Sequence, residues 1–267
     1  MQRSGIDGRS TYSLDNAGQE ASSRFHALAD TFDAGTIRHL EDLGVGPGWR
    51  CLEVGGGGGS IARWLASRIE SSGHLLITDI DPRFLESLNL PNAEVRRHNI
   101  ATDPLPEAAF DLVHARLVLT HIPDREAALT RMVASLKPGG WLLVEEIDIS
   151  LSPDPASFHG EVHAKTFDAM LRAMEQRGVD HRFGRRLFGQ LRSLGLDKVA
   201  SEGKASVWTA TTPGTSILRA NFEQLHDDIL RTGLVTEQEF EQDMAEMSDP
   251  SFMMPSPILW SAWGQRP

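Results

Sequence analysis

The chain has 267 residues, 40% of them hydrophobic, and its 26 Lys and Arg against 37 Asp and Glu give a formal net charge of −11. A chain of this length can bury a full core without disulfides or metals. The acidic balance opposes sequence-independent binding to phosphate backbones, which requires clustered cationic groups. The most basic stretch is residues 181–192 (HRFGRRLFGQLR), for which a solvated helix face with arginine stems over apolar neighbours is the favoured interpretation.

The single cysteine, Cys51, excludes an intramolecular disulfide and gives no support for secretion. The polar first residues lack the apolar segment of a signal peptide, and no stretch approaches the roughly 20 apolar residues of a membrane span. We therefore expect a cytoplasmic protein that acts on a small-molecule substrate, with no nucleic-acid or membrane partner. A homodimer is kept as a hypothesis for its assembly.

Helical patterns dominate the beginning of the chain. We expect residues 1–18 to be a disordered tail and residues 19–45 to form N-terminal helices. Apolar residues recur at helical spacing between Gln19 and Leu43, and they predict two helices broken near residues 33–35.

Short β-like runs then alternate with helical patterns. The runs are residues 50–54, 74–79, 93–99, 110–116 and 141–148, and the helical stretches between them are 60–70, 82–88 and 124–137. Asp124 is a candidate N-cap, and residues 137–140 (KPGG) a stop for the last of these helices. The alternation predicts right-handed βαβ crossovers and a parallel sheet covered on both faces.

The last third of the chain changes character. Helical patterns at 155–177 and 183–194 precede a strand-like run at 198–208. Two more helices are expected at roughly 214–231 and 237–247, the second opened by a capping box at Thr236–Glu239, before a last strand within 257–264.

We expect one α/β domain with a Rossmann-like, doubly wound, mostly parallel seven-stranded sheet and an antiparallel edge strand. Residues 46–207 and 256–267 are expected to form the cofactor-binding core. Residues 208–255 are expected to form a helical lid insertion.

The segment at residues 50–66 (RCLEVGGGGGSIARWLA) carries the strongest chemical signal. A strand, a glycine turn and an amphipathic helix follow one another, so the glycines let the chain turn and let a ligand approach without meeting a Cβ. The helix start adds unpaired N–H groups and the positive end of its dipole. The segment therefore predicts a nucleotide-type cradle at the carboxyl edge of the first strand.

The spacing of the glycines selects among nucleotides. No Gly-Lys-Ser/Thr follows, which excludes a P-loop, and the dinucleotide fingerprint survives only weakly, in the frame Gly57–Gly59–Ala62. The pattern E-x-G-x-G-x-G fits without substitution, with Glu53, Gly55, Gly57 and Gly59. It resembles motif I of the class I S-adenosylmethionine-dependent methyltransferases. The resemblance spans about residues 20–150 and includes the run LKPGGWLLVEE.

The resemblance assigns roles to the ends of the next two strands. Glu53 and Gly55, Gly56 and Gly57 become cofactor-binding residues. Asp79, about 20 residues past the loop, becomes the ribose-binding acid and Ile80 the apolar neighbour of adenine, although an Asp after a strand is as often a turn former. Asn99 and Ile100 would contact adenine by side chain and backbone, unless Asn99 only bonds its own turn.

Two residues on the fourth strand and after it have open roles. Arg116 pairs with the methionine carboxylate of the cofactor or merely caps the sheet edge. His121, just before Pro123, is the candidate catalytic residue, as a general base or a wall of the cofactor site, while a packed loop histidine is the favoured alternative. Glu145, Glu146 and Asp148 are further base candidates at the cleft edge.

No metal site is expected. His159 and His163 share a helix face, but Glu161 does not lie on it and no second ligand cluster is evident. A stripe of apolar residues from Phe222 to Met254 reads as ordinary core packing or as a pliable lid over an apolar acceptor. The substrate pocket is expected between this insertion and the N-terminal helices.

The resemblance therefore implies a methyltransferase (EC 2.1.1.-) that uses S-adenosylmethionine. Its acceptor would be a small, hydrophobic or aromatic metabolite methylated at O, C or N, as in natural-product biosynthesis and other secondary metabolism. An enzyme of the same fold that binds the cofactor but catalyses a non-methylating reaction such as cyclisation is the alternative. A nicotinamide dehydrogenase is disfavoured, because no Tyr-x-x-x-Lys pair is present.

Overall fold

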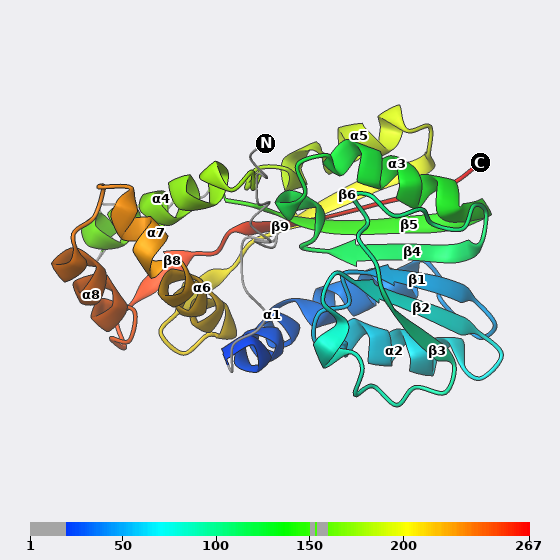
Figure 1. Ribbon diagram of the computed structural model, residues 1–267, viewed down its shortest axis with the longest axis horizontal. Helices are drawn as coiled ribbons and strands as arrows, with labels where there is room; N and C mark the ends of the chain where they lie inside the picture. The colour runs from blue at the N-terminus through cyan, green and yellow to red at the C-terminus, as the bar shows by residue number, and fades with distance from the viewer. Residues whose placement is uncertain (1–19, 150–152, 154–159) are drawn as a thin grey trace, which may run out of the picture.

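A computed structural model describes residues 20–149, 153 and 160–267. Its centre is a seven-stranded sheet with the order β3-β2-β1-β4-β5-β9-β6 (Figure 1). The strands are β1 (Arg50–Val54), β2 (His74–Asp79), β3 (Ala93–Arg97), β4 (Phe110–Arg116), β5 (Leu136–Asp148), β6 (Asp197–Lys204) and β9 (Ile258–Gln265). β1 to β5 pair in parallel, and β9 is antiparallel to both β5 and β6. The expected fold class is confirmed, with the antiparallel strand one place in from the sheet edge.

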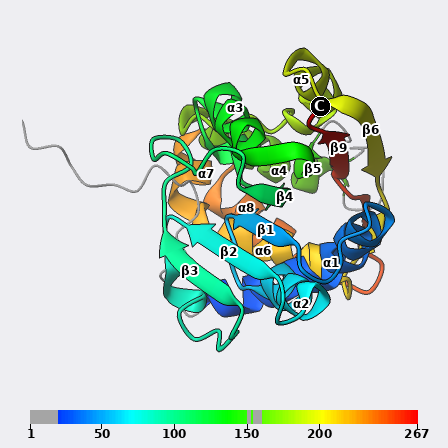
Figure 2. The same cartoon turned by 90° about the vertical axis from the view of Figure 1, so that its right-hand side faces the viewer.

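Helices cover both faces of the sheet (Figure 2). One apolar cluster joins β1, β4 and β5 to α3 (Arg125–Ser135) and α5 (Leu187–Ser193). A second cluster joins the opposite face to α1 (Glu20–Asp42) and α2 (Ser60–Ile69). Because central strands such as β1 are buried on both faces, their apolar residues run consecutively instead of alternating.

Several expected boundaries are wrong. The N-terminal helical region is one helix, because Gly35 stays within α1 and residues 33–35 do not break it. The stretch after β2 forms only the short 3₁₀ turn η1 (Pro82–Phe84), where the Asp81 side chain accepts from Arg83 N. Asp124 precedes α3, as expected, but its side chain makes no capping hydrogen bond.

β5 also begins earlier than expected, at Leu136. The KPGG residues, expected to end α3, lie instead inside β5, where its pairing with β4 shifts register. The expected strand at 93–99 ends at Arg97, and the expected strand-like run near residue 200 divides into β6 and the short β7 (Val207–Thr209). The expected helix at 183–194 is the turn η3 (Gly184–Arg186) followed by α5.

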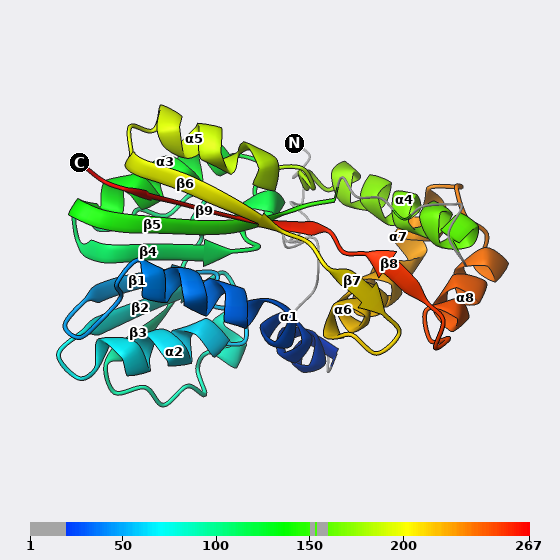
Figure 3. The ribbon, with the colours of Figure 1, turned by 180° about the vertical axis from the view of Figure 1, so that it is seen from behind.

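A further group of helices lies beyond the carboxyl ends of the strands, on the left in Figure 1, and packs around a third apolar cluster. It is built from α4 (Gly160–Gln176), α6 (Pro213–Gln224), α7 (His226–Arg231), α8 (Glu237–Glu246) and the hairpin-like pair of β7 with β8 (Met253–Pro255). Figure 3 shows β7 leaving the end of β6 and β8 leading into β9. The capping box of Thr236 and Glu239 is confirmed at the start of α8. Across the described residues, no helix is long and apolar enough to cross a bilayer.

Candidate cofactor and acceptor site

A cavity of about 310 Å³ lies along the carboxyl edge of the sheet. Its walls come from the ends of β1, β2, β3 and β4, from the 3₁₀ turn η2 (Leu119–His121) and from α1. All nine expected cofactor-binding residues and His121 line it: Glu53, Gly55, Gly56, Gly57, Asp79, Ile80, Asn99, Ile100, Arg116 and His121. The cavity is thus where an open α/β sheet binds its ligand.

The glycine loop after β1 is held against the end of β2. The amides of Gly55 and Gly56 donate to Thr78 O, and Gly57 N donates to Asp79 Oδ2 at 3.0 Å. Gly55, Gly57 and Gly59 have φ of 72°, 52° and 75°, values that L side chains rarely adopt. The sequence therefore needs glycine at these alternating positions for the turn itself.

Asp79 lies at the rim of this loop. Its Oδ1 accepts from Asp81 N at 2.9 Å while Oδ2 accepts from Gly57 N, so the carboxylate fixes the loop and still faces the cavity. Burial raises the pKa of Asp79, and the backbone hydrogen bonds oppose that shift. Both expected roles, turn former and cavity carboxylate, fit this geometry.

Asn99 also bonds within its own loop. Its Oδ1 accepts from Ala101 N at 3.0 Å, and its backbone N donates to Asp103 Oδ2 at 2.9 Å. Asn99 and Ile100 nevertheless line the cavity. The Asn99 side-chain oxygen therefore bonds within its own turn, as the alternative interpretation predicts. A ligand would have to share that oxygen or contact the amide nitrogen.

Arg116, at the end of β4, is held by α1. Its guanidinium donates to Asp33 Oδ1 at 2.7 Å and to Thr36 Oγ1 at 2.8 Å. Thr36 Oγ1 in turn donates to the buried Glu145 Oε2 at 2.5 Å. No local sequence pattern predicts this link, because Asp33 and Thr36 are 80 or more residues away from Arg116 along the chain.

Glu53 is the most unusual acid in the cavity. The residue is 4% exposed, and its Oε2 has no hydrogen-bond partner within the described part of the chain. Burial raises the pKa of Glu53 to about 8, against a smaller opposing effect of Arg116. A buried acceptor without a donor marks a position where a ligand donor fits.

His121 lies in η2 and is 8% exposed. Burial, with a further contribution from the positive charge of Arg24, lowers the pKa of His121 to about 4. The imidazole is therefore neutral near pH 7 and a weak base.

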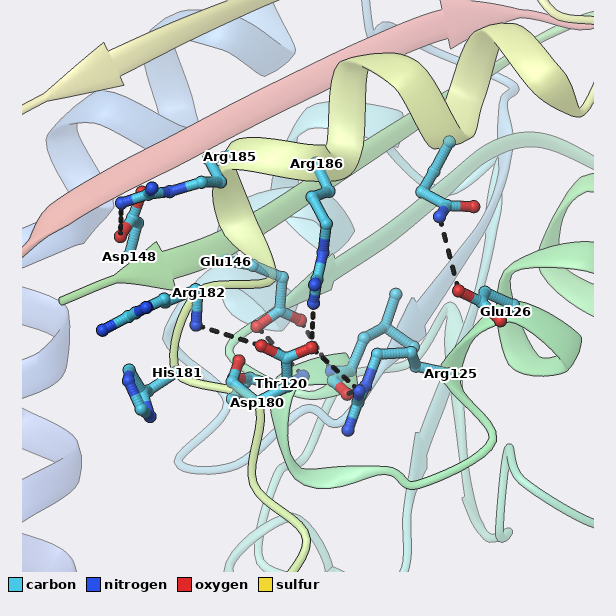
Figure 4. Close-up of polar contacts among 12 residues, drawn as sticks. Thr120, Arg125, Glu126, Glu146, Asp148, Asp180, His181, Arg182, Arg185 and Arg186 are labelled. Atoms are coloured by element: carbon cyan, nitrogen blue, oxygen red, sulfur yellow. Dashed lines mark hydrogen bonds and ion pairs between the residues drawn. The ribbon is translucent and has the colours of Figure 1, made fainter. Parts of the chain in front are cut away.

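The carboxylates of the other base candidates are hydrogen-bonded or ion-paired within the protein. The Glu146 carboxylate accepts from the amides of Val118, Leu119 and Thr120, so it holds the start of η2 in place. Burial raises its pKa to about 7. Asp148 forms a two-pronged ion pair with Arg185, at 2.6 and 2.9 Å (Figure 4).

Glu145 is equally fixed. It is fully buried and accepts from Ser261 Oγ at 2.6 Å as well as from Thr36. Burial would raise its pKa, but His114, Arg116 and the Ser261 hydroxyl outweigh that effect and lower the pKa to about 2. A carboxylate this weakly basic does not remove a proton from a phenol or a carbon acid.

The arginine-rich stretch does not form a free basic patch. Arg186 and Arg125 both pair with Asp180 (Figure 4). Both guanidinium groups also lie over the Phe183 ring, 5.6 Å from its centroid. The favoured sequence interpretation, arginine stems over apolar neighbours, agrees with this arrangement. The two ion pairs join the loop at Asp180 to α3 and η3.

A second cavity, of about 110 Å³, adjoins the first. The two share the side chains of Leu28, Leu117 and His121 as walls. The second cavity continues past the ends of β4 and β5 towards α4, α6 and β7, and its surface is mostly apolar. Leu117, at the junction, has φ of 57°, a strained value for a branched side chain that marks the boundary of the two cavities.

The second cavity lies where the substrate pocket was expected, but its walls differ from the expected stripe. Most of the apolar residues of the stripe from Phe222 to Met254 form the core between the helices. The cavity is lined instead by α4 and α6 side chains, and by Arg24 and Asn221, which the sequence did not single out. An amphipathic pattern identifies buried faces but not which buried face borders a void.

The metal hypothesis concerns His159 and His163. His159 lies outside the described residues, and His163 is buried and bonded to Asp243 Oδ1 at 2.9 Å. Within the described residues no cluster of three or more His, Cys, Asp or Glu side chains is arranged to hold a metal.

Comparison with known proteins decides among the nucleotide-binding families. Residues 52–144 match the family model described as a methyltransferase domain. The ubiquinone/menaquinone biosynthesis C-methyltransferase of Bordetella parapertussis is 30% identical over 201 residues, which are 66% of this chain and 76% of that protein. The chain belongs to the class I S-adenosylmethionine-dependent methyltransferases. S-adenosylmethionine is the cofactor of this family.

Two further methyltransferases are similar to this chain over different shares of their length. Methyltransferase str3 of Strobilurus tenacellus is 32% identical over 161 residues, 58% of this chain and 55% of that protein, so the match spans about half of it. The phosphoethanolamine N-methyltransferase 2 of Haemonchus contortus superposes with a TM-score of 0.62 at 17% identity, over 97% of this chain and 60% of that one. That likeness supports the methyltransferase fold.

The residues present fit S-adenosylmethionine. The glycine loop leaves room for close backbone approach, Asp79 offers a carboxylate at the end of β2, and Glu53 Oε2 offers a buried acceptor to a cationic ligand. The cofactor is an electrophile whose methyl group is attached to a positively charged sulfur.

Proposed function

We propose that this methyltransferase transfers a methyl group to a small, apolar, aromatic acceptor held in the second cavity. The observation that carries the proposal is the mostly apolar second cavity that meets the cofactor cavity at Leu117 and His121. The cofactor cavity runs across the ends of β3, β2, β1 and β4, and the second cavity continues from β4 towards β5. An acceptor there is adjacent to the end of the cofactor cavity formed by Arg116 and Leu117.

Individual cofactor contacts belong to the same proposal. Asp79 accepts hydrogen bonds from the ribose hydroxyls, Ile80 packs on adenine, and Asn99 and Ile100 contact the adenine edge. Glu53, Gly55, Gly56 and Gly57 hold the amino-acid part, and Arg116, oriented by Asp33 and Thr36, is placed to attract its carboxylate.

We further propose that the acceptor atom is carbon, activated by a neighbouring oxyanion. Arg24 lines the second cavity, is 5% exposed and lowers the pKa of His121 by its charge. A buried guanidinium favours a phenolate or enolate over the neutral acceptor. The B. parapertussis relative is named a C-methyltransferase, which supports the same acceptor type.

The reaction then needs little acid–base catalysis. S-adenosylmethionine would supply an electrophilic methyl group. The phenol proton would pass to solvent, and a π electron pair of the phenolate, at a ring carbon ortho or para to the oxygen, would form the bond to the methyl carbon while the carbon–sulfur bond breaks and sulfur keeps its electron pair. That ring carbon would then lose its proton to a water molecule, which restores the aromatic ring. The protein contributes alignment of the ring carbon with the methyl group, which supplies most of the rate.

Transfer of a labelled methyl group tests the proposal. The chain is incubated with methyl-labelled S-adenosylmethionine and a panel of phenols, hydroquinones and hydrophilic amines, and the products are located by mass spectrometry and NMR. We expect label on a ring carbon of an apolar phenolic acceptor, and loss of S-adenosylhomocysteine binding in Asp79→Ala. Label only on hydrophilic amines would contradict the acceptor class, and turnover without label transfer would favour the non-methylating alternative.

A further inference from the structure

The polar atoms that line the acceptor cavity are few, and most are already bonded. Thr120 Oγ1 donates to Asp180 O at 2.6 Å. His181 Nδ1 lies 3.3 Å from Glu175 Oε1, a charge pair without hydrogen-bond geometry. Arg24 donates to Gln224 Oε1 at 3.1 Å. These contacts hold the walls of the cavity together.

Asn221 contributes a neutral hydrogen-bond acceptor to the second cavity. It comes from α6 and lines the second cavity, and its Oδ1 is shielded from solvent with no hydrogen-bond partner among the described residues. The preceding turn of the same helix contributes the apolar residues Ile217 and Leu218 to the cavity. Asn221 therefore brings an amide to an otherwise apolar wall.

Buried polar groups in folded proteins are nearly always hydrogen-bonded, and exceptions mark sites where another molecule completes the bond. An apolar methyl acceptor that carries a hydroxyl supplies the missing donor. A site built this way also rejects analogues without the hydroxyl, because they leave the amide unpaired.

We propose that Asn221 is a specificity-determining residue, whose amide oxygen accepts a hydrogen bond from the hydroxyl of the neutral acceptor as it binds, before that acceptor ionises beside Arg24. The inference rests on the proposed function, because it assigns the second cavity to the acceptor. It extends that function by naming the group that is recognised: a hydroxyl donor on an apolar ring, positioned by α6 opposite the turn that carries His121.

A pair of probes of equal shape isolates the hydrogen bond. 4-Ethylphenol and 4-ethyltoluene differ by a hydroxyl in place of a methyl group. Dissociation constants are measured by calorimetry with saturating S-adenosylhomocysteine, and the toluene-to-phenol ratio is compared between the native chain and Asn221→Leu. We expect the substitution to lower this ratio about 5–10-fold, the value of one hydrogen bond to a neutral partner.

Two variants control the measurement. Met170→Leu changes the apolar wall of the same cavity and should leave the ratio unchanged. Asn221→Asp keeps an oxygen acceptor and should preserve the preference for the phenol. Retained affinity for S-adenosylhomocysteine shows that each variant is folded, and Asn221→Ala replaces the leucine variant if the latter fails this check.

The outcomes separate the inference from the proposed function. An unchanged ratio in folded Asn221→Leu or Asn221→Ala overturns the role of Asn221, even where methyl transfer to phenols proceeds. Failure of both probes to bind the native chain, together with no label transfer to any phenol, overturns the assignment of the acceptor cavity and so the proposed function as well.

Discussion

Three buried glutamates near the cofactor cavity show how strongly the surroundings control a carboxyl group. Glu53 has its pKa raised to about 8 by burial, and Glu146 to about 7 by burial despite three backbone donors. Glu145 has its pKa lowered to about 2, because His114, Arg116 and Ser261 outweigh burial. The three side chains are chemically identical, so their different charges at pH 7 follow from their neighbours.

The state of Glu53 predicts a proton-linked cofactor affinity. With a pKa of about 8, Glu53 is mostly protonated in the free chain at pH 7, and a cationic cofactor favours the ionised form. Binding of S-adenosylmethionine should therefore release close to one proton at pH 7. Calorimetry in buffers of different ionisation enthalpy measures the number. Glu53→Gln should release none, and an equal release from this variant would contradict the assignment.

His121 should behave as a wall of the site and not as a base. Its pKa of about 4 leaves it neutral throughout the range above pH 5. We expect His121→Gln to lower kcat less than about tenfold, against the 10²–10⁴-fold that general-base catalysis contributes. The pH–rate profile should follow the pKa of the acceptor in both proteins. A large loss of kcat together with loss of an ionisation from the profile would show instead that His121 is the base.

At the scale of elements, α1 closes the cofactor cavity. Phe25 packs against the glycine loop, where an ideal Cβ on Gly58 would come within 2.7 Å of the Phe25 Cβ. The Phe25 ring also contacts Phe84 edge-on at 5.2 Å. With the Asp33–Arg116 ion pair, these contacts fix the helix at both ends of the cavity.

Two glycine-to-alanine substitutions should have opposite effects. Gly58→Ala should displace the start of α1, weaken binding of S-adenosylhomocysteine and speed amide exchange in residues 20–30. Gly35→Ala is the matched control: it lies inside α1, its added Cβ meets nothing within 4 Å, and alanine should stabilise the helix by about 0.5–1 kcal/mol. Unchanged cofactor affinity in Gly58→Ala would show that α1 does not cover the loop tightly.

At the scale of the whole molecule, two groups of elements form the two cavities. The sheet and its covering helices carry the glycine loop and the strand ends that line the first cavity. α4 and α6, which lie beyond the strand ends in Figure 1, contribute walls to the second cavity. The expected division into a core and a lid at residues 208–255 stays a prediction, and α4 also contributes to the apolar cluster of that insertion.

Buried protonated acids should make the cofactor-free chain less stable as pH rises. Between pH 6.5 and 8 the folded chain retains protons on Glu53 and Glu146, with pKa of about 8 and 7, while the unfolded chain, with carboxyl pKa near 4.5, does not. The folded state binds more protons, so the free energy of unfolding falls as pH rises, on the order of 1 kcal/mol per pH unit. The buried histidines with lowered pKa, His39, His121 and His181, oppose this near pH 6.5, and their effect becomes small above about pH 7.5, where the unfolded imidazoles have lost their protons.

Urea unfolding at several pH values measures this slope. Glu53→Gln should make it shallower. Glu239→Gln is the control, since the pKa of Glu239 is lowered to about 2 by the backbone hydrogen bond with Thr236 and its charge is the same in both states over this range. A free energy of unfolding that rises with pH, or a slope that is unchanged in Glu53→Gln, would contradict the protonated state of Glu53.

The sequence alone determined the fold class, the glycine cradle and the family. The order of strands and helices, and the strand–glycine–helix succession at Glu53–Gly59, are written in local patterns of hydrophobicity and turn residues. The same local patterns misjudged Gly35 and the KPGG residues. Packing of α1 on the sheet and pairing of β5 with β4 outweigh a weak local propensity.

Only the tertiary structure decided which side chains share a cavity and what charge they carry. The contacts of Arg116 with Asp33 and Thr36 join residues far apart in the chain, and so do the walls of the second cavity, to which Asn221 contributes. The pKa values of Glu53, Glu145 and His121 depend on burial and on non-local neighbours. The spacing of residues along the chain encodes neither the cavity walls nor these pKa values, because both depend on contacts between separate elements.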